Sequence, residues 1–284
     1  MAVKQFDIIK RSYLTGSELI PIDELESPIG LRVEGGGYIF YDDTVGFSGF
    51  SGAGFSPSAN GGSSVPANAL ANRWSVKASY GTYKYDMLRG CVVRESDGAC
   101  NRFMVVDETD MVSSAYGSML MWDTSANAST SRATSTDFGY GSANTILLAG
   151  GYDTGGNTIP GVITGNETIW PTVRMFRHAY PQPYGDLIDS ALDTRWFVPS
   201  RDELYVLVSM TCCLAYSRPI NSIYSRCQLL TPVWPYYWSS SQDSSSSDAT
   251  GKAWTGNAAK HIAEMSSFDK TRGLDLRVRL CRTF

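Results

Sequence analysis

The sequence is poor in charge and in histidine. Charged residues make up 18% of its 284 residues, the formal net charge is −4, and no dense run of Lys or Arg occurs. A nucleic-acid partner requires a basic surface, so we expect none. The two histidines, His178 and His261, are far apart and have no carboxylate or cysteine at ligand spacing. This argues against a metalloenzyme and against a Ser/His/Asp hydrolase.

Long apolar segments are also missing. The opening residues, MAVKQFDIIKRSYL, lack the apolar core of about 7–15 residues that a secretion signal needs. No later segment approaches the roughly 20 apolar residues that span a bilayer. We therefore expect no signal peptide, no membrane span and synthesis in a cytoplasm.

The cysteines form no CxxC pair and no regular framework, so neither a zinc cluster nor a disulfide scaffold is indicated. We expect buried thiols. Cys91 and Cys100 flank the turn-like RESDG and could pair across a hairpin, but the absent signal argues against that bond. No glycine-rich stretch matches a phosphate-binding loop that begins a helix, and we expect no cofactor. The six cysteines are Cys91, Cys100, Cys212, Cys213, Cys227 and Cys281.

What is present favours strands and loops over long helices. Hydrophobic residues reach 43%, with 27 Gly, 16 Tyr and 7 Trp, which is enough for a sizeable core in an α+β fold. We expect a small β-rich N-terminal piece and its connection over residues 1–66, and one large domain over residues 67–284. Strands are predicted at residues 6–9, 31–33, 38–41, 74–80, 91–93, 103–106, 119–122 and 146–148.

The connection over residues 45–66 is rich in Gly and Ser and contains three phenylalanines, Phe47, Phe50 and Phe55. Either it is an ordered loop packed on the body, or it leads into a partner interface. Exposed apolar clusters seldom occur without a partner, so the three rings predict a surface for homo-oligomer formation in the second case.

The clearest local signal is the segment WFVPSRDEL, residues 196–204. Ser200 followed three residues later by Glu203 is a capping box, and Pro199 keeps the residue before it out of helical geometry. Leu204, Leu207, Val208 and Cys212 then share one helical face. The pattern predicts a helix from Arg201 to about Leu214.

The C-terminus alternates between apolar and polar residues. Leu274, Leu276, Val278 and Leu280 alternate with Asp275, Arg277, Arg279 and Cys281. This period of two predicts one strand that is buried on the leucine side, with Cys281 on its wetter face. Between helix and strand lies a serine-rich run, residues 239–247, whose composition alone is typical of a flexible linker.

The order of these motifs carries a resemblance. WFVPSRDEL, a helix, then YWSSS at 237–241, Ala253-Trp254 and finally VRLCR at 278–282 resemble the formylglycine-generating-enzyme-like branch of the C-type lectin fold, and most of all the variable proteins of diversity-generating retroelements. GYGSANTILLAGGYDTGGNTIP at 139–160 is similar to the upstream part of that domain. The resemblance covers residues 103–284, and individually the motifs are of middling specificity.

The resemblance implies a C-type-lectin-like fold of short antiparallel sheets, about two helices and long ordered loops. It also implies a variable region over about 234–284, in which error-prone copying changes selected codons while framework residues stay fixed. A surface that tolerates many side chains has to contribute little to stability. Framework positions are expected at Trp238, Ser239, Ser240, Ser241, Ala253, Val278 and Leu280.

The display positions should bind a protein or cell-surface receptor. Their mix of Tyr, Trp, Ser and Asn is the one that paratopes use. Alternatively, they are solvated loop residues. The display set is Tyr236, Tyr237, Asp243, Ser245, Ser246, Asp248, Lys252, Trp254, Asn257, His261, Ser266, Asp269 and Arg272.

Three alternatives remain. A structural or adhesive phage-tail or surface subunit would use the same fold without diversification. Enzymes of this fold oxidise a sulfatase cysteine with a cysteine pair near the C-terminus, but here Cys281 is alone in the terminal segment, so we expect no enzyme. Calcium would need oxygens such as those of Asp243 with Asp248, or of Asp107, Glu108 and Asp110. The leading expectation is a diversified receptor-binding protein of a virion or of a cell surface reached by another export route.

Overall fold

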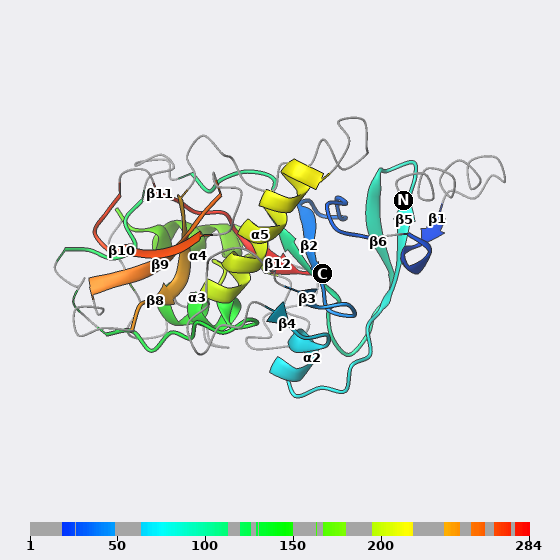
Figure 1. Ribbon diagram of the computed structural model, residues 1–284, viewed down its shortest axis with the longest axis horizontal. Coiled ribbons are helices and arrows are strands. Elements are labelled where there is room, and N and C mark those ends of the chain that lie inside the picture. The colour runs from blue at the N-terminus through cyan, green and yellow to red at the C-terminus, as the bar shows by residue number, and fades with distance from the viewer. Residues whose placement is uncertain are drawn as a thin grey trace.

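The computed structural model describes residues 19–25, 27–48, 64–112, 120–125, 129, 131–149, 163, 167–179, 195–217, 236–244, 251–258, 264–273 and 276–284. Over these residues the chain is a mixed α+β structure of small, mostly antiparallel sheets and four α-helices (Figure 1). The α+β class agrees with the prediction from composition.

The central sheet joins three distant parts of the chain. Its strands are β2 (Tyr38–Asp42), β7 (Phe103–Val106) and β12 (Cys281–Thr283), in the order β12-β7-β2 with antiparallel neighbours. All four residues of β7 are fully buried, as expected for a short continuous apolar run in the middle of a sheet. The predicted N-terminal piece therefore contributes a strand to the sheet that holds the C-terminus.

A second sheet has the order β1-β5-β6, with β1 (Leu19–Pro21), β5 (Thr82–Asp86) and β6 (Cys91–Ser96). Strands β5 and β6 form a hairpin whose turn ends at Gly90, where a φ of 65° favours glycine. A 3₁₀ turn, Ile22–Glu24, follows β1. The strand predicted at 91–93 is confirmed and extends to Ser96.

The shortest elements lie beside the central sheet. Strands β3 (Phe47–Ser48) and β4 (Ser64–Val65) pair with each other, and helix α2 (Ala69–Arg73) follows. Phe47 is buried, with its ring centroid 6.2 Å from that of Tyr205. For Phe47 this supports the alternative of a loop packed on the body over that of an exposed aromatic cluster, while Phe50 and Phe55 lie outside the described residues.

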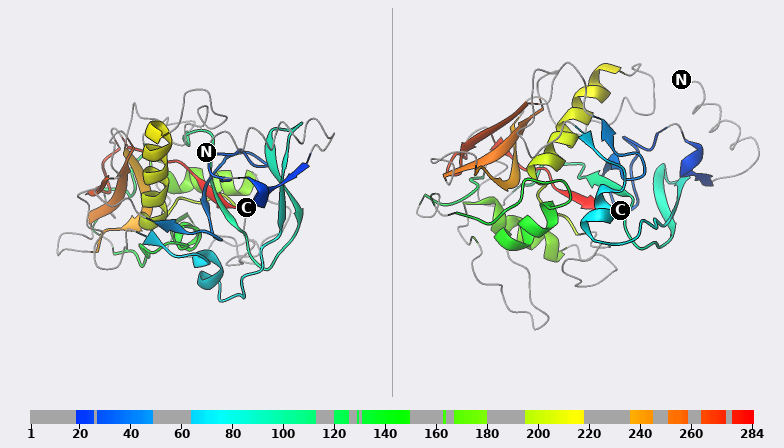
Figure 2. Two further views of the ribbon diagram at one scale, coloured as in Figure 1. Left: turned by 45° about the vertical axis from the view of Figure 1, so that its right-hand side comes forward. Right: turned by 60° about the horizontal axis from the view of Figure 1, so that its bottom comes forward.

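The predicted helix is present as α5 (Arg201–Ser217). It begins at the predicted residue, and Leu204, Leu207 and Val208 are fully buried on one face. Figures 1 and 2 show α5 between the central sheet and the C-terminal strands. Helix α4 (Ile169–Ala179) was not expected from the sequence.

The strand predicted at 146–148 is wrong, because these residues belong to helix α3 (Gly141–Ala149). A short apolar run cannot distinguish a strand from a buried helical turn. The buried polar side chains of α3 find partners: the Thr145 hydroxyl donates to the Gly141 carbonyl at 2.7 Å and accepts from the Val198 N–H at 2.9 Å.

Three other predicted strands are also wrong. Trp74 follows α2 directly, and in residues 74–80 the strand pairing is a single bridge from Tyr80 to Cys100. In residues 120–122, the described part of the strand predicted at 119–122, the pairing is a single bridge from Met121 to Thr168. Leu31–Val33 likewise forms isolated bridges rather than a strand, and residues 6–9 lie outside the described residues.

The single terminal strand is in fact two short ones. Strand β11 (Leu276–Arg277) pairs in parallel with β8 (Tyr236–Gln242), whereas β12 belongs to the central sheet. Leu276, Val278 and Leu280 are buried as predicted. Leu274 and Asp275 lie outside the described residues.

The predicted wet face is wrong for Arg279 and Cys281, which are both buried. The Arg279 guanidinium forms a 2.7 Å ion pair with Asp110 and donates to the Asp107 carbonyl at 3.0 Å, which compensates for the loss of water. Cys281 packs in the cluster around α5 and exchanges two backbone hydrogen bonds with Phe197, which lies just before that helix.

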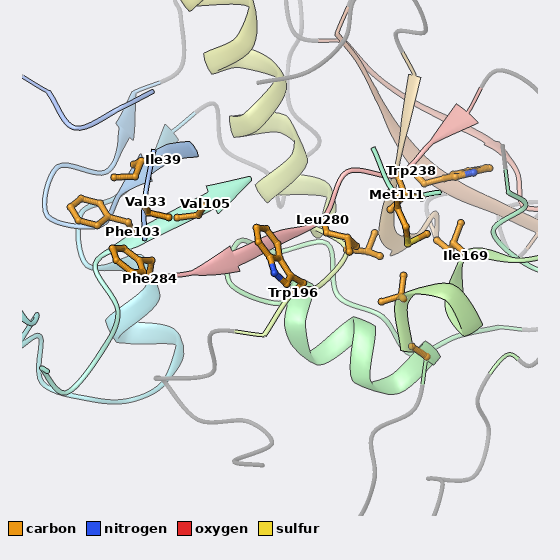
Figure 3. Packing of buried hydrophobic residues seen from close by; sticks show 14 of the residues in the cluster. Val33, Ile39, Phe103, Val105, Met111, Ile169, Trp196, Trp238, Leu280 and Phe284 are labelled. Atoms are coloured by element: carbon orange, nitrogen blue, oxygen red, sulfur yellow. The ribbon is translucent and has the colours of Figure 1, made fainter. Parts of the chain in front are cut away.

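Two buried apolar clusters form the core. Figure 3 shows the first running from Phe103, Val105 and Phe284 past Trp196 and Leu280 to Trp238. The second gathers around α5 and contains Leu204, Val208 and Cys281.

Cys91, Cys100 and Cys281 are free, buried thiols, so the disulfide between Cys91 and Cys100 does not form. None of the described helices has the length and apolar character needed to cross a membrane.

Candidate functional site

The C-terminal sheet, which carries most of the expected display positions, lies between the two clusters. Its order is β10-β9-β8-β11, with β9 (Lys252–Asn257) and β10 (Glu264–Asp269). Opposed residues in antiparallel strands share a face, and successive residues alternate. Trp238 and Ala253 belong to the first cluster, and Tyr237 and Met265 to the second. We call these sides the Trp238 face and the α5 face.

Gly256 allows helix α5 to lie close to the sheet. A Cβ on this residue would come within 2.8 Å of Val208 Cγ2 and 3.0 Å of Leu204 Cγ. Both faces are therefore covered near the middle of the sheet. Half-buried and exposed side chains collect along the edge strand β10, in the turn that follows it and at the adjoining end of β9. We call this group the edge surface: Lys252, Trp254, Glu264, Ser266, Ser267, Phe268, Asp269 and Arg272.

The three serines of YWSSS are fully buried, and each hydroxyl has a partner. The strand register is irregular between Trp238 and Gln242, which leaves room for side-chain hydrogen bonds in place of ladder bonds. The Ser239 hydroxyl donates to the Trp254 carbonyl (2.9 Å), the Ser240 hydroxyl donates to the Pro199 carbonyl (3.2 Å) and the Ser241 hydroxyl donates to the Ser135 carbonyl (2.7 Å). These residues, which composition alone would assign to a linker, thus form a fixed strand.

The same hydroxyls also accept hydrogen bonds. Asn144 Nδ2 of α3 donates to Ser240 Oγ at 3.2 Å, and the Arg201 N–H at the start of α5 donates to Ser241 Oγ at 2.9 Å. Buried polar groups with partners on several elements specify one arrangement of those elements. Strand β8 is in this way tied to α3 and to α5.

Three fully buried tryptophans lie in and beside β8, and each indole N–H donates a hydrogen bond to a backbone carbonyl. Trp238 donates to Leu120 O at 3.1 Å, and Trp122 donates to Ser239 O at 2.8 Å. Trp170 donates to Trp122 O at 2.6 Å, and its ring meets that of Trp122 edge-on at 5.3 Å. The prediction that Trp238 is a core residue is confirmed.

Helix α5 begins with the predicted capping box. The Ser200 N–H donates to Glu203 Oε2 at 2.6 Å, and the Glu203 N–H donates to Ser200 Oγ at 3.3 Å. Glu203 Oε1 also accepts from the N–H groups of Gly139 (3.0 Å) and Gly141 (3.3 Å). Burial raises the pKa of Glu203 to about 7 although these backbone donors oppose the rise. One carboxyl therefore holds the helix start against the loop before α3.

A buried polar cluster closes the other end of β8. Gln242 Oε1 accepts from the Arg132 N–H at 2.6 Å and from Lys270 Nζ at 3.1 Å. The Asp123 carboxylate pairs with the Arg132 guanidinium at 3.1 Å. Lys270 Nζ lies 5.0 Å from the centre of the Trp122 ring, and burial lowers its pKa to about 8. The cluster fixes the ends of β8 and β10 relative to each other.

The structure places the expected display residues in different surroundings. Asp269 and Arg272 are exposed, and Tyr236, Lys252, Trp254 and Ser266 are half-buried. By the strand register, Tyr236 and Ser266 lie on the Trp238 face, whereas Lys252, Trp254 and Asp269 lie on the α5 face. Apart from Tyr236, which lies on β8, these positions belong to the edge surface, and together they do not form one flat face.

Three members of the display set are buried, which corrects the expectation that they point outward. Tyr237 packs in the cluster around α5 and is fully buried. Asn257 is buried while its amide donates to Glu264 Oε2 at 3.2 Å, and Asp243 is buried with its N–H donating to the Lys252 carbonyl at 3.0 Å. Ser245, Ser246, Asp248 and His261 lie outside the described residues.

Sequence reasoning missed two stacked groups. The Arg272 guanidinium lies 4.4 Å from the centre of the Phe268 ring, which meets the Tyr236 ring edge-on at 5.3 Å. On the α5 face the Arg201 guanidinium lies 5.4 Å from the centre of the Trp254 ring. Phe268 lies two residues after Ser266 and therefore on the same face of β10, and this period of two was the available signal. Arginine and aromatic side chains are the residues most enriched at binding hot spots.

Two of the acidic residues considered for calcium are paired with arginines, and Asp248 lies outside the described residues. Asp110 pairs with Arg277 at 2.6 Å and with Arg279 at 2.7 Å, and Glu108 pairs with Arg32 at 2.7 Å. Among the residues that the structure describes, no three His, Cys, Asp or Glu side chains form a group able to hold a metal ion. Burial raises the pKa of the Cys281 thiol well above its ordinary value, which disfavours the thiolate that redox chemistry uses.

No protein-family model, no curated protein and no solved structure matches the chain.

Proposed function

We propose that this chain is a ligand-binding display protein with a C-type-lectin-like fold, whose region 234–284 is diversified by a retroelement and whose edge surface binds a protein or cell-surface receptor. The observation that carries the proposal is the separation of roles within β8, β9 and β10. Strand β8 is buried from Tyr237 to Gln242, whereas the side chains that reach solvent lie on β9 and β10, at positions such as Lys252, Trp254 and Asp269.

The buried positions support a framework role. The proposed framework residues Trp238, Ser239, Ser240, Ser241, Ala253, Val278 and Leu280 are at most 2% exposed. Replacing such residues creates cavities or leaves buried polar groups without partners, so they have to stay constant. Exposed positions elsewhere on the same strands change stability by less than about 0.5 kcal/mol each when substituted.

The proposed variable region is anchored on both sides. At its start, β8 is bonded to α3 and α5 through its serines. At its end, β12 pairs with β7 in the central sheet, and Phe284 exchanges two backbone hydrogen bonds with Phe103. A segment held at both ends can present changing side chains without changing its path.

The edge surface has the chemistry of a protein-binding site. Arg272 stacked on Phe268, and Trp254 stacked under Arg201, offer amphipathic area at low conformational cost. Ser266, Ser267 and Lys252 add polar groups that can adapt to different partners.

The decisive experiment is to sequence the DNA around the coding region. The proposal expects a neighbouring reverse-transcriptase gene and a near-copy of the codons for about Trp234 to Phe284, which differs from them where the copy has adenine. Codons for Trp238 and Ser240 should be identical in both copies, whereas codons for Lys252, Asp269 and Arg272 should include mismatches. If no such copy exists in the genome, the chain is a non-diversified structural or adhesive subunit instead.

A further inference from the structure

The polar cluster at the end of β8 contains an amine and an amide held together away from water. Lys270 is fully buried and Gln242 is 4% exposed, and Lys270 Nζ lies 3.1 Å from Gln242 Oε1. Their backbones are fixed as well, because Lys270 N donates to the Gly251 carbonyl at 2.8 Å and the Gln242 N–H donates to Thr134 Oγ1 at 2.8 Å.

We propose that Lys270 Nζ and the side-chain amide of Gln242 form an intramolecular isopeptide bond. The bond would join the end of β8 to the turn after β10, across the intervening strand β9. This inference is independent of what the edge surface binds.

The step balances without an oxidant or a cofactor. The Nζ lone pair attacks Cδ of Gln242, the Nζ–Cδ bond forms and the Cδ–Nε2 bond breaks. One proton passes from Nζ to Nε2, which leaves as ammonia. The amine has to turn from the amide oxygen to the adjacent carbon, a rotation about the last torsions of the lysine side chain.

Each group that the step needs is present in the cluster. Attack requires an uncharged amine, and burial lowers the pKa of Lys270 to about 8, so a substantial fraction is neutral near that pH. The Arg132 N–H, 2.6 Å from Oε1, is placed to stabilise the oxyanion of the tetrahedral intermediate. Asp123 is a fully buried carboxylate whose charge acts on the lysine, and it can transfer the proton.

Pre-organisation supplies the rate. Once the amine has turned toward Cδ, two groups held in this way within a folded protein react as though at effective concentrations of up to about 10⁵–10⁸ M. The exclusion of water also protects the amide from hydrolysis. An amide bond formed here would replace a buried amine, whose charged form is disfavoured, with a neutral group.

Intact mass spectrometry of the full-length chain in denaturant tests the proposal. The expected mass is lower than that of the sequence by about 17 Da, one ammonia. A protease digest should yield a branched peptide in which the segment containing Gln242 is joined to the one containing Lys270. The full sequence mass, persisting after the folded chain is held at about pH 9, above the pKa of about 8, would overturn the proposal.

Two variants separate this bond from other losses of ammonia. Lys270→Arg removes the amine and should restore the full mass. Lys252→Arg, a matched change on the edge surface, should keep the loss and the branched peptide. A loss of about 17 Da that survives Lys270→Arg would arise elsewhere and would also contradict the proposal.

Discussion

Ser200 and Glu203 bind each other's backbone, with the Ser200 N–H donating to Glu203 Oε2 at 2.6 Å and the Glu203 N–H donating to Ser200 Oγ at 3.3 Å. The same carboxyl binds the backbone of Gly139 and Gly141. The start of α5, which contacts β9 in the C-terminal sheet, therefore depends on one buried side chain.

Glu203→Gln should lower the free energy of unfolding by about 1–3 kcal/mol at neutral pH. The amide NH₂ replaces a carboxylate oxygen that accepts a hydrogen bond, so a backbone N–H loses its acceptor and faces another donor. Denaturant titration measures the loss. Asp202→Asn is the matched control one residue earlier. Asp202 is half-buried and pairs with its neighbour Arg201, so its loss should stay below about 1 kcal/mol. Equal losses for both variants would contradict the role given to Glu203.

The raised pKa of Glu203 predicts that the free energy of unfolding depends on pH. Its folded pKa of about 7 lies above the ordinary value of 4.5. The folded state therefore holds the proton more tightly, and this contribution to stability is full below about pH 4.5 and is lost as the pH rises through about 7. The wild-type chain should lose up to about 3 kcal/mol relative to Glu203→Gln across that interval. If the free energies of unfolding of the two proteins changed in parallel with pH, Glu203 would not titrate between about pH 4.5 and 7.

Ser240→Ala should lower the free energy of unfolding by about 1–2 kcal/mol, because its hydroxyl bridges Asn144 of α3 and the Pro199 carbonyl inside the protein. Ser267→Ala is the control on half-buried strand β10, and its effect should be within about 0.5 kcal/mol. Thermal unfolding of the two variants gives the comparison. A Ser240→Ala protein as stable as Ser267→Ala would mean that the buried serines are not framework.

Cys281 should resist alkylation in the native protein. It is fully buried, and burial raises its pKa well above the ordinary value. Iodoacetamide followed by peptide mass analysis should find Cys281 unlabelled until denaturant is added. Rapid native labelling would reopen the alternative of a cysteine oxidase.

Local signals were read correctly from the sequence where neighbouring residues decide the structure. The start of α5 follows from Ser200, Glu203 and Pro199, which act within one turn. The buried serines were predicted through the resemblance, whereas composition alone indicated a linker. The hydrogen-bond partners of their hydroxyls are Ser135, Asn144 and Pro199, which lie far away in the sequence.

Features that depend on packing between distant elements were not predictable. Tyr237 looks like a display residue until α5 packs over it, and Asn257 until the register places it on the central strand β9 between Tyr236 and Glu264. Arg279 and Cys281 follow a period of two, but an ion pair with Asp110 and packing in the cluster around α5 bury the side that the pattern leaves to water. The helix at 141–149 was missed because its apolar run is too short to distinguish the two periods.

The central claim is that the edge surface can change without unfolding the sheet beneath it. The most direct measurement is the free energy of unfolding of the combined variant Lys252→Ala, Ser266→Ala, Asp269→Ala and Arg272→Ala. We predict a total loss below about 2 kcal/mol, against about 3–5 kcal/mol for the single change Trp238→Ala in the framework. A combined variant that is destabilised as much as Trp238→Ala would contradict the claim, because the displayed side chains would then be part of the fold.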